Sequence, residues 1–338
     1  MDRHAWEQPG AHEEAPAIYR IALPLPGDHL KAVNVYAIAD GEQVVMIDGG
    51  WALADAEELL TLSLAQIGYG LSDVREFLVT HVHRDHYTQA IAVRRAVGSR
   101  VSLGEGEQIT LDAIRRVNAH PDVVSLYGAG ALELSRQLES WTDSQSEAPD
   151  LMNWEDPDRW LPDGLDIPLN TRTLRVIATP GHTRGHVVFH DPAAKVLFGG
   201  DHVLPHITPS IGIEMVRPPS PLRDYMGSLL LTKTLPDARL LPAHGPVTAS
   251  VHQRVDELLA HHEQRLIDTA EAIDKGAGTG FEAANILTWT RRQRHFDELD
   301  LFNQVMAVNE TMAHLEVLVE RGWLRRETLD GVEFFSRA

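Results

Sequence analysis

The feature that most constrains this chain is the hexad His-Val-His-Arg-Asp-His at residues 81–86, which places four metal-binding side chains within six residues. The hexad directly follows the apolar run Phe-Leu-Val at 77–79, so we expect a strand that ends in a ligand-bearing loop at the rim of a sheet. Zinc binds imidazole nitrogen and carboxylate oxygen, and a catalytic zinc keeps one position open for water. The loop offers more ligands than one zinc needs, which favours two metals.

Three later segments repeat this arrangement of an apolar, strand-like run followed by Gly or Pro beside a His or Asp. They are residues 174–178 before Thr-Pro-Gly-His-Thr-Arg-Gly-His at 179–186, residues 195–198 before Gly-Gly-Asp-His at 199–202, and residues 238–241 before Pro-Ala-His-Gly at 242–245. A solvated, histidine-rich loop would explain the hexad alone, but it would not explain the repetition. Enzymes assemble sites from separate strand ends in this way, so we predict one site built from all four segments.

The ordered series His-x-His-x-Asp-His, Gly-His-Thr-x-Gly-His, Gly-Gly-Asp and His-Gly resembles the ligand set of metallo-β-lactamase-fold hydrolases. It is more similar to the glyoxalase II and LACTB2-like branch than to the true β-lactamases, and the resemblance covers about residues 18–250. It implies an α/β fold of the αββα sandwich type. It also implies a first metal on His81, His83 and His182, a second on Asp85, His86 and His244, and Asp201 as the bridge, with Asp85 and Asp201 as the carboxylates of the catalytic centre.

The resemblance implies two Zn²⁺ ions as cofactors, with Mn or Fe as alternatives that ligands alone do not distinguish. Two cations about 3.5–4 Å apart need a shared anion, which a carboxylate and a hydroxide supply. The metals lower the pKa of bound water to about 7 and polarise the substrate's oxygen, so no Ser or Cys nucleophile is required.

Other residues near the motifs receive weaker assignments. His186 is interpreted as a residue that positions its loop, whereas His202 and His206 are pocket residues at most. Asp48 ends a strand-like run, and we weigh a hydrogen bond to the metal-ligand loop equally against a simple turn role. The helical pair at 261–262 is expected at the surface.

Composition is that of a globular enzyme. The 338 residues are 43% hydrophobic, contain no Cys and carry a net charge of −19, which disfavours phosphate backbones as general partners. No apolar run reaches the length of a membrane span, and residues 1–16 are polar, so we expect a frayed tail, a cytoplasmic protein and no membrane contact.

Residues 17–250 are predicted to form the catalytic domain. Within it, residues 107–168 exceed what a minimal domain of this kind needs and include Trp141, Trp154 and Trp160. We interpret this stretch as a lid over the substrate pocket, and the alternative is a surface insertion that its Trp residues pack down. In the Pro-rich segment 210–224, Arg217 and Arg223 could bind a substrate carboxylate, but we expect them to pair with local acids at the surface.

Residues 251–338 predict helices followed by a hairpin around Asp330-Gly331, a winged-helix-like pattern that LACTB2-like proteins resemble. A nucleic-acid-binding domain should be basic, yet the sequence from Ile286 onward contains seven arginines and nine acidic residues. The arginines in question are Arg291, Arg292, Arg294, Arg325 and Arg326, together with two further along the helix and hairpin. Nucleic acid is therefore an unlikely partner, and we favour a role as a cap over the cleft or as a homo-oligomer contact.

Three functions remain open at this stage. The leading hypothesis is a dinuclear hydrolase that uses a metal-bound hydroxide on a small ester-like substrate, namely a thioester, lactone or other acyl compound. The second is a metal-dependent ribonuclease or phosphodiesterase of the LACTB2-like type. The third is a metal-sensing binding or regulatory protein, which has no physical reason to keep seven ligands together.

Overall fold

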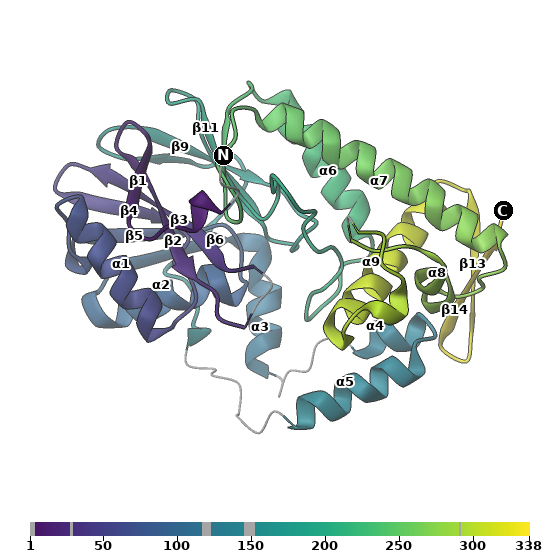
Figure 1. The fold of residues 1–338 in the computed structure, drawn as a ribbon. Coiled ribbons are helices and arrows are strands. Elements are labelled where there is room, and N and C mark those ends of the chain that lie inside the picture. The colour runs from purple at the N-terminus through teal and green to yellow at the C-terminus, as the bar shows by residue number, and fades with distance from the viewer. Residues whose placement is uncertain (1–3, 28–29, 117–122, 145–152, 291) are drawn as a thin grey trace.

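Two β-sheets stack face to face, and helices cover both outer sides, in a computed structural model of the chain (Figure 1). The structure describes residues 4–27, 30–116, 123–144, 153–290 and 292–338, of which 123–125 and 141–144 are described by their backbone alone. These layers confirm the predicted αββα sandwich. The side chain of Trp141 and all of Arg291 lie outside the described residues.

The first sheet has seven strands in chain order, antiparallel from β1 to β4 and parallel from β4 to β7. Its strands are β1 (Ala11–Ala15), β2 (Ile18–Pro24), β3 (Ala32–Asp40), β4 (Gln43–Ile47), β5 (Val74–Val79), β6 (Arg100–Gly104) and β7 (Arg159–Leu161).

The second sheet has five strands in the order β12-β11-β10-β9-β8, and a separate two-stranded hairpin ends the chain. The strands are β8 (Asp166–Pro168), β9 (Thr173–Ala178), β10 (Val187–Asp191), β11 (Val196–Gly200) and β12 (Arg239–Pro242), with β13 (Leu324–Leu329) and β14 (Val332–Arg337) in the hairpin.

The helices fall into an N-terminal pair, a group in the 107–168 segment and a C-terminal group. They are α1 (Ala54–Gln66), α2 (Arg84–Val97), α3 (Gln108–Arg116), α4 (Val123–Gly128), α5 (Leu132–Ser144), α6 (Pro221–Thr234), α7 (Val251–Asp274), α8 (Gly280–Ile286) and α9 (Leu301–Glu320), with short 3-10 helices η1 (Ala5–Glu7), η2 (Leu71–Asp73), η3 (Glu105–Glu107) and η5 (Phe296–Glu298). Among the described helices, none is both long enough and apolar enough to cross a membrane.

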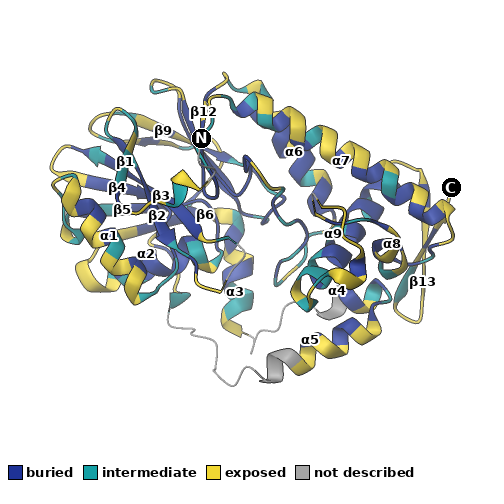
Figure 2. Cartoon of the chain, in the orientation of Figure 1, coloured by how far each residue is buried: buried dark blue, intermediate teal, exposed yellow. Residues whose placement is uncertain are grey.

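Alternation along the strands explains the layers. In β4, Val45 and Ile47 face the space between the sheets, whereas Val44 and Met46 face α1 and α2 on the outside. Both faces of these strands are therefore apolar, as sheets covered on two sides require. Figure 2 shows the strands β3, β4 and β5 almost uniformly buried and the outer surfaces of α1 and α2 exposed.

The 107–168 segment divides between two parts of the fold. Its helices α4 and α5 pack against α9 and share an apolar cluster with the C-terminal helices. Trp154 and Trp160, in contrast, pack against the outer cluster of the seven-stranded sheet. The helices before the hairpin around Asp330 form as predicted, while the lid role, the domain boundaries and a winged-helix identity for residues 251–338 stay predictions.

Two expectations were wrong. Residues 11–15 are not part of a frayed tail but form β1, because they pair with β2 and because Glu14 accepts hydrogen bonds from Arg20 (3.1 Å) and Arg239 (2.8 Å).

His262 is not at the surface but fully buried, because it lies on the face of α7 that packs against α9, with its Nδ1 3.3 Å from Nε2 of His314.

Candidate metal centre

The ends of four strands meet at one rim of the sandwich, and each is followed by one of the predicted ligand segments. The strands are β5, β9, β11 and β12, as the sequence predicted. β4, β5 and β6 are parallel, and β11 runs parallel to β12, so their carboxyl ends open toward the same rim. The predicted ligands gather there in two groups, His81, His83, His182 and Asp201 in one and Asp85, His86 and His244 in the other.

Asp201 lies between the two groups and turns one carboxylate oxygen toward each. Its Oδ2 is 3.4 Å from Nε2 of His182 and 4.0 Å from Nε2 of His81. Its Oδ1 is 3.4 Å from Nε2 of His244 and 3.9 Å from Nε2 of His86. A tetrahedral zinc with bonds of about 2.1 Å separates its ligand atoms by about 3.4 Å, so both sets of distances suit a metal.

The remaining ligand-to-ligand distances are of the same size. In the first group, Nδ1 of His83 lies 3.0 Å from Nε2 of His81 and 3.0 Å from Nε2 of His182. In the second, Oδ2 of Asp85 lies 3.6 Å from Nε2 of His86 and 3.5 Å from Nε2 of His244.

Hydrogen bonds at the far side of three imidazoles fix which nitrogen faces the centre. Nδ1 of His182 donates to the carbonyl of Ser210 (2.8 Å), and Nδ1 of His244 donates to the carbonyl of Ala32 (3.0 Å). A carbonyl only accepts, so Nδ1 carries the proton and Nε2 presents its lone pair to the centre. Nδ1 of His86 lies 2.9 Å from the Asp48 carboxylate, which has the same effect.

Asp48 holds the hexad loop in place. Its backbone is in the left-handed region (φ +61°), which costs energy for a residue other than glycine. Its carboxylate accepts hydrogen bonds from the backbone N–H (2.7 Å) and hydroxyl (3.0 Å) of Thr80, next to His81. The structure therefore places Asp48 at the metal-ligand loop rather than in a solvent-facing turn.

Two buried polar atoms in the centre have no hydrogen-bond partner among the described residues. They are Nε2 of His86 and Oδ1 of Asp201, and both face the second group. Buried polar atoms are almost always satisfied, and an imidazole nitrogen beside a carboxylate oxygen suits a cation. These atoms therefore fit a metal in the second group, and the ligand distances of the first group fit one there as well.

The two groups differ in their electrostatics. Burial and the neighbouring imidazoles lower the pKa of His81 well below its usual value and that of His83 to about 3. Burial also lowers the pKa of His182, so all three imidazoles of the first group are neutral and ready to bind a metal.

In the second group, the neighbouring carboxylates together have a larger effect on the histidine pKa values than burial has. Burial opposes the charge on His86, but Asp85, Asp48 and Asp201 outweigh it and raise the pKa of His86 to about 10. Burial likewise opposes the charge on His244, and Asp201 and Asp85 raise its pKa. A metal entering this group must displace a proton that the first group does not hold.

The other predicted residues lie outside both ligand groups. Nε2 of His186 accepts from the backbone N–H of Asp201 (3.1 Å), and its Nδ1 lies 2.9 Å from the hydroxyl of Thr179, so His186 joins two ligand segments. Buried His202 turns its Nε2 to the hydroxyl of Thr232 (2.9 Å). His206 is exposed and belongs to neither group.

Sequence reasoning missed Glu107, which connects two ligand segments. Its fully buried carboxyl group accepts hydrogen bonds from the hydroxyl of Thr183 and from the backbone N–H of Val82. Burial raises the pKa of Glu107 to about 8, and Glu214 adds to the rise. Nothing in the local pattern marks this residue, because its partner Thr183 is 76 residues away in the chain.

Comparison with known proteins agrees with this geometry. The profile of the metallo-beta-lactamase superfamily matches residues 30–244. The chain is 25% identical to the beta-lactamase-like protein 2 homolog of Caenorhabditis elegans, over 74% of this chain and 68% of that protein. It is 24% identical to the atrochrysone carboxyl ACP thioesterase of Aspergillus fumigatus, over 71% of this chain but only 44% of the longer fungal protein.

Among solved structures, the metallo-beta-lactamase family protein TTHA1429 of Thermus thermophilus superposes with a TM-score of 0.72 at 28% identity. That match covers 96% of this chain and 99% of the Thermus chain, so the similarity extends through the C-terminal helices as well as the sandwich. The chain therefore belongs to the metallo-beta-lactamase superfamily.

Proposed function

We propose that this protein is a dinuclear metal-dependent hydrolase of small ester-like acyl compounds, with thioesters as the first substrate class to test. The observation that carries the proposal is the position of Asp201, whose two carboxylate oxygens face separate groups of ligands at 3.4 Å. A single metal would need one such group, whereas a shared carboxylate is what two adjacent cations require.

Two metal ions held by these residues would supply a water-derived nucleophile at neutral pH and a Lewis acid for the substrate's carbonyl oxygen. The protein's own contribution is to fix the ligands. Asp48, Ser210 and Ala32 orient three imidazoles, and His186 holds the backbone of Asp201. Because these contacts are buried, the ligand atoms need not reorganise during the reaction.

The name of the Aspergillus fumigatus relative, an ACP thioesterase, favours acyl thioesters among the ester-like classes. The chain spans less than half of that protein, so its substrate comes here only as a proposal. A small-molecule substrate also agrees with a net charge of −19, which disfavours polyanionic partners.

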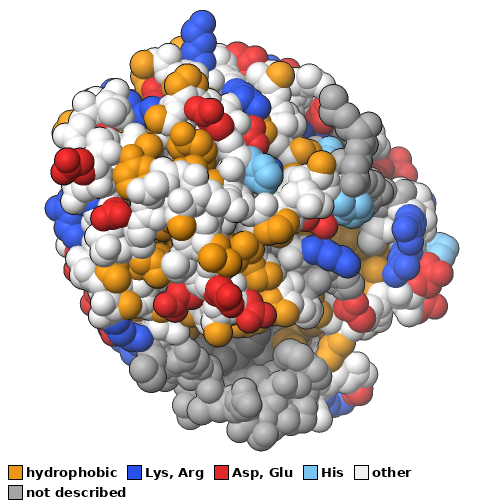
Figure 3. Space-filling model, turned by 60° about the vertical axis from the view of Figure 1, so that its left-hand side comes forward, with side chains coloured by type: hydrophobic (Ala, Val, Ile, Leu, Met, Phe, Trp, Pro, Cys, Tyr) orange, Lys and Arg blue, Asp and Glu red, His pale blue; other side chains and the backbone are white. Residues whose placement is uncertain are grey.

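The second candidate is a ribonuclease or phosphodiesterase that uses the same ligands. The C-terminal hairpin after α9 and the similarity to a beta-lactamase-like protein 2 homolog favour it. The charges oppose it, since Arg326 is paired with Glu333 at 3.3 Å. On the face drawn in Figure 3, the described Lys and Arg side chains lie scattered among Asp and Glu and form no continuous basic patch.

One experiment separates these functions. The zinc-loaded protein would be assayed against acyl thioesters, lactones, p-nitrophenyl esters and bis-p-nitrophenyl phosphate, with single-stranded RNA in parallel. We expect metal-dependent cleavage of an acyl compound that His83→Ala abolishes. Turnover of the phosphodiester or RNA alone would favour the second candidate, and inertness of the two-zinc protein toward every compound would contradict both.

A further inference from the structure

One loop connects the first metal group to the C-terminal helices. It comprises residues 208–220, between the segment of Asp201 and α6. Near its start, the Ser210 carbonyl accepts the Nδ1 proton of His182 (2.8 Å), so the position of this carbonyl sets the orientation of a ligand. The hydrogen bond that orients the His182 imidazole comes from this loop and not from one of the four ligand segments. The orientation of the imidazole therefore depends on the position of the loop.

The far end of this loop is attached to α9 by a buried ion pair. Arg217 donates from Nη1 to Oε1 of Glu316 (2.8 Å) and from Nη2 to Oε2 (3.1 Å), a bidentate contact between residues 99 positions apart. The Arg217 and Glu316 side chains are only 14% and 10% exposed. A bidentate pair of this kind fixes direction as well as distance, and water screens it little.

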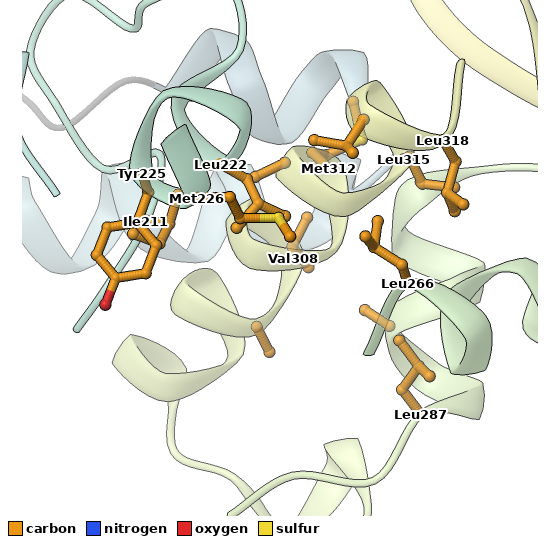
Figure 4. Packing of buried hydrophobic residues seen from close by; sticks show 14 of the residues in the cluster. Ile211, Leu222, Tyr225, Met226, Leu266, Leu287, Val308, Met312, Leu315 and Leu318 are labelled. Carbon is orange, nitrogen blue, oxygen red and sulfur yellow. The ribbon is translucent and has the colours of Figure 1, made fainter. Parts of the chain in front are cut away.

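Residues 211, 214 and 216 of the loop are also held in place between these two ends. Ile211, directly after Ser210, is 2% exposed and packs in the apolar cluster that contains Val308 and Met312 of α9 (Figure 4). Arg184, two residues after His182, donates to the carbonyl of Val216 and to the Glu214 carboxylate (3.3 Å). A displacement at Arg217 is therefore transmitted to Ser210 rather than absorbed by a slack segment.

We propose that Glu316 of α9 is a positioning residue for the first metal group, because its ion pair with Arg217 holds the loop whose Ser210 carbonyl orients His182. The inference rests on the proposed function only in requiring that the first group binds a metal. It assigns to the C-terminal helices a part in the metal centre, although the described residues of α9 contribute no ligand to it.

The chain offers a matched control on the same helix. One turn after Glu316, Glu320 accepts from Nη1 of Arg223 (3.1 Å), and that pair also joins α9 to the region around the start of α6. The Arg223 and Glu320 side chains are 55% and 39% exposed, and no metal ligand accepts or donates a hydrogen bond along that path among the described contacts. Exposed pairs of this kind contribute little.

The experiment compares Glu316→Gln with Glu320→Gln at pH 8, above the pKa of about 7 to which burial raises Glu316. Zinc affinity would be measured by chelator competition, and exchange of the His182 Nδ1–H proton would be followed by NMR on zinc-loaded protein with labelled histidine. We expect Glu316→Gln to lower the affinity of the zinc held by the first group about tenfold and to speed the exchange of that proton by a similar factor. Glu320→Gln should change neither by more than about twofold.

Arg217→Lys keeps the positive charge but loses the bidentate contact, and it serves if Glu316→Gln does not fold. It should weaken zinc binding while Arg223→Lys does not. If either variant at the buried pair lowers the melting temperature but leaves zinc affinity and proton exchange at wild-type values, the pair is structural only and the proposal is wrong. Both readouts are independent of any substrate, so a failed search for hydrolysis would not affect this test.

Discussion

Replacing Asp48 by asparagine should cost the protein its second metal while leaving the first in place. In the wild type, Oδ1 of Asp48 accepts from the backbone N–H of Thr80 (2.7 Å), which demands an oxygen at that position. In Asp48→Asn the new side-chain amide nitrogen would then occupy the Oδ2 position, 2.9 Å from Nδ1 of His86. Two donors cannot face each other, so the imidazole proton moves to Nε2, the atom that faces the metal.

The magnitude follows from the contact that is lost. A hydrogen bond to a charged group contributes about 1.5–3 kcal/mol, and about 1.4 kcal/mol corresponds to a tenfold change in an equilibrium constant. The affinity for the second zinc should therefore fall between about tenfold and a hundredfold, which is the range seen when partners of metal-binding histidines are removed. In the first group, His81 is linked to Asp48 through the Thr80 hydroxyl, which lies 3.0 Å from Nδ1 of His81. That hydroxyl can still donate to Oδ1 of the asparagine, as it does to Oδ1 of Asp48 (3.0 Å), so the first group should keep its zinc.

Zinc content after dialysis and chelator competition would measure both affinities. Asp40→Asn is the matched control, because Asp40 is also buried and lies at the turn of the β3–β4 hairpin, at the opposite end of β4 from Asp48. Asp40 likewise accepts hydrogen bonds from backbone N–H groups, those of Asn170 (3.0 Å) and Thr171 (2.9 Å). That variant should lose stability and still bind two zincs. If Asp48→Asn bound its second zinc within threefold of the wild type, the role assigned to Asp48 would be refuted.

Three further results are expected. Asp201→Ala should lower bound zinc below two per chain and reduce kcat by at least about a hundredfold, because both groups lose a shared anion. His202→Asn, the control, should keep both zincs. If Asp201→Ala kept full activity with two bound metals, the role of Asp201 as the bridge would be wrong. Glu107 has a folded pKa of about 8 against an ordinary value of 4.5, so its contribution to stability is complete below about pH 4.5 and is lost as the pH rises toward 8. Denaturant titrations should show the stability of the wild type relative to Glu107→Gln falling by up to about 1.4 kcal/mol per pH unit across that window, and a constant difference would contradict the raised pKa. Stripping the metals with a chelator should lower the calorimetric melting temperature and zinc should restore it, because a metal that binds only the folded state stabilises it; an unchanged melting temperature would argue that neither group binds metal.

The strands and the convergence of the seven candidate ligand residues at their ends could be predicted because each segment is a local pattern. Each candidate ligand segment follows an apolar run of strand-forming residues, and in three of the four segments a Gly or Pro marks the end of the strand. The expected pairing with local surface acids holds for Arg223, which contacts its neighbour Asp224 (2.9 Å) as well as Glu320 (3.1 Å). It was wrong for Arg217, whose partner Glu316 has a side chain only 10% exposed and lies 99 residues further along the chain. The sequence could suggest that a partner exists but not which acid supplies it.

What could not be predicted is the set of contacts that orient the ligands, because each joins segments that only the fold brings together. The carbonyl of Ala32, which fixes His244, is 212 residues from it, and a backbone carbonyl has no sequence signature at all. Glu107 gives no signal either, since it reads as one more acid at the start of a long insertion. β1 was missed for a related reason: its five residues are mostly polar or small, and only pairing with β2 and the contacts of Glu14 make them a strand. The candidate ligands can thus be found from short sequence motifs, whereas their orientation depends on hydrogen-bond partners that only the fold brings close. Mutations at those partners are the ones that would separate metal affinity from folding.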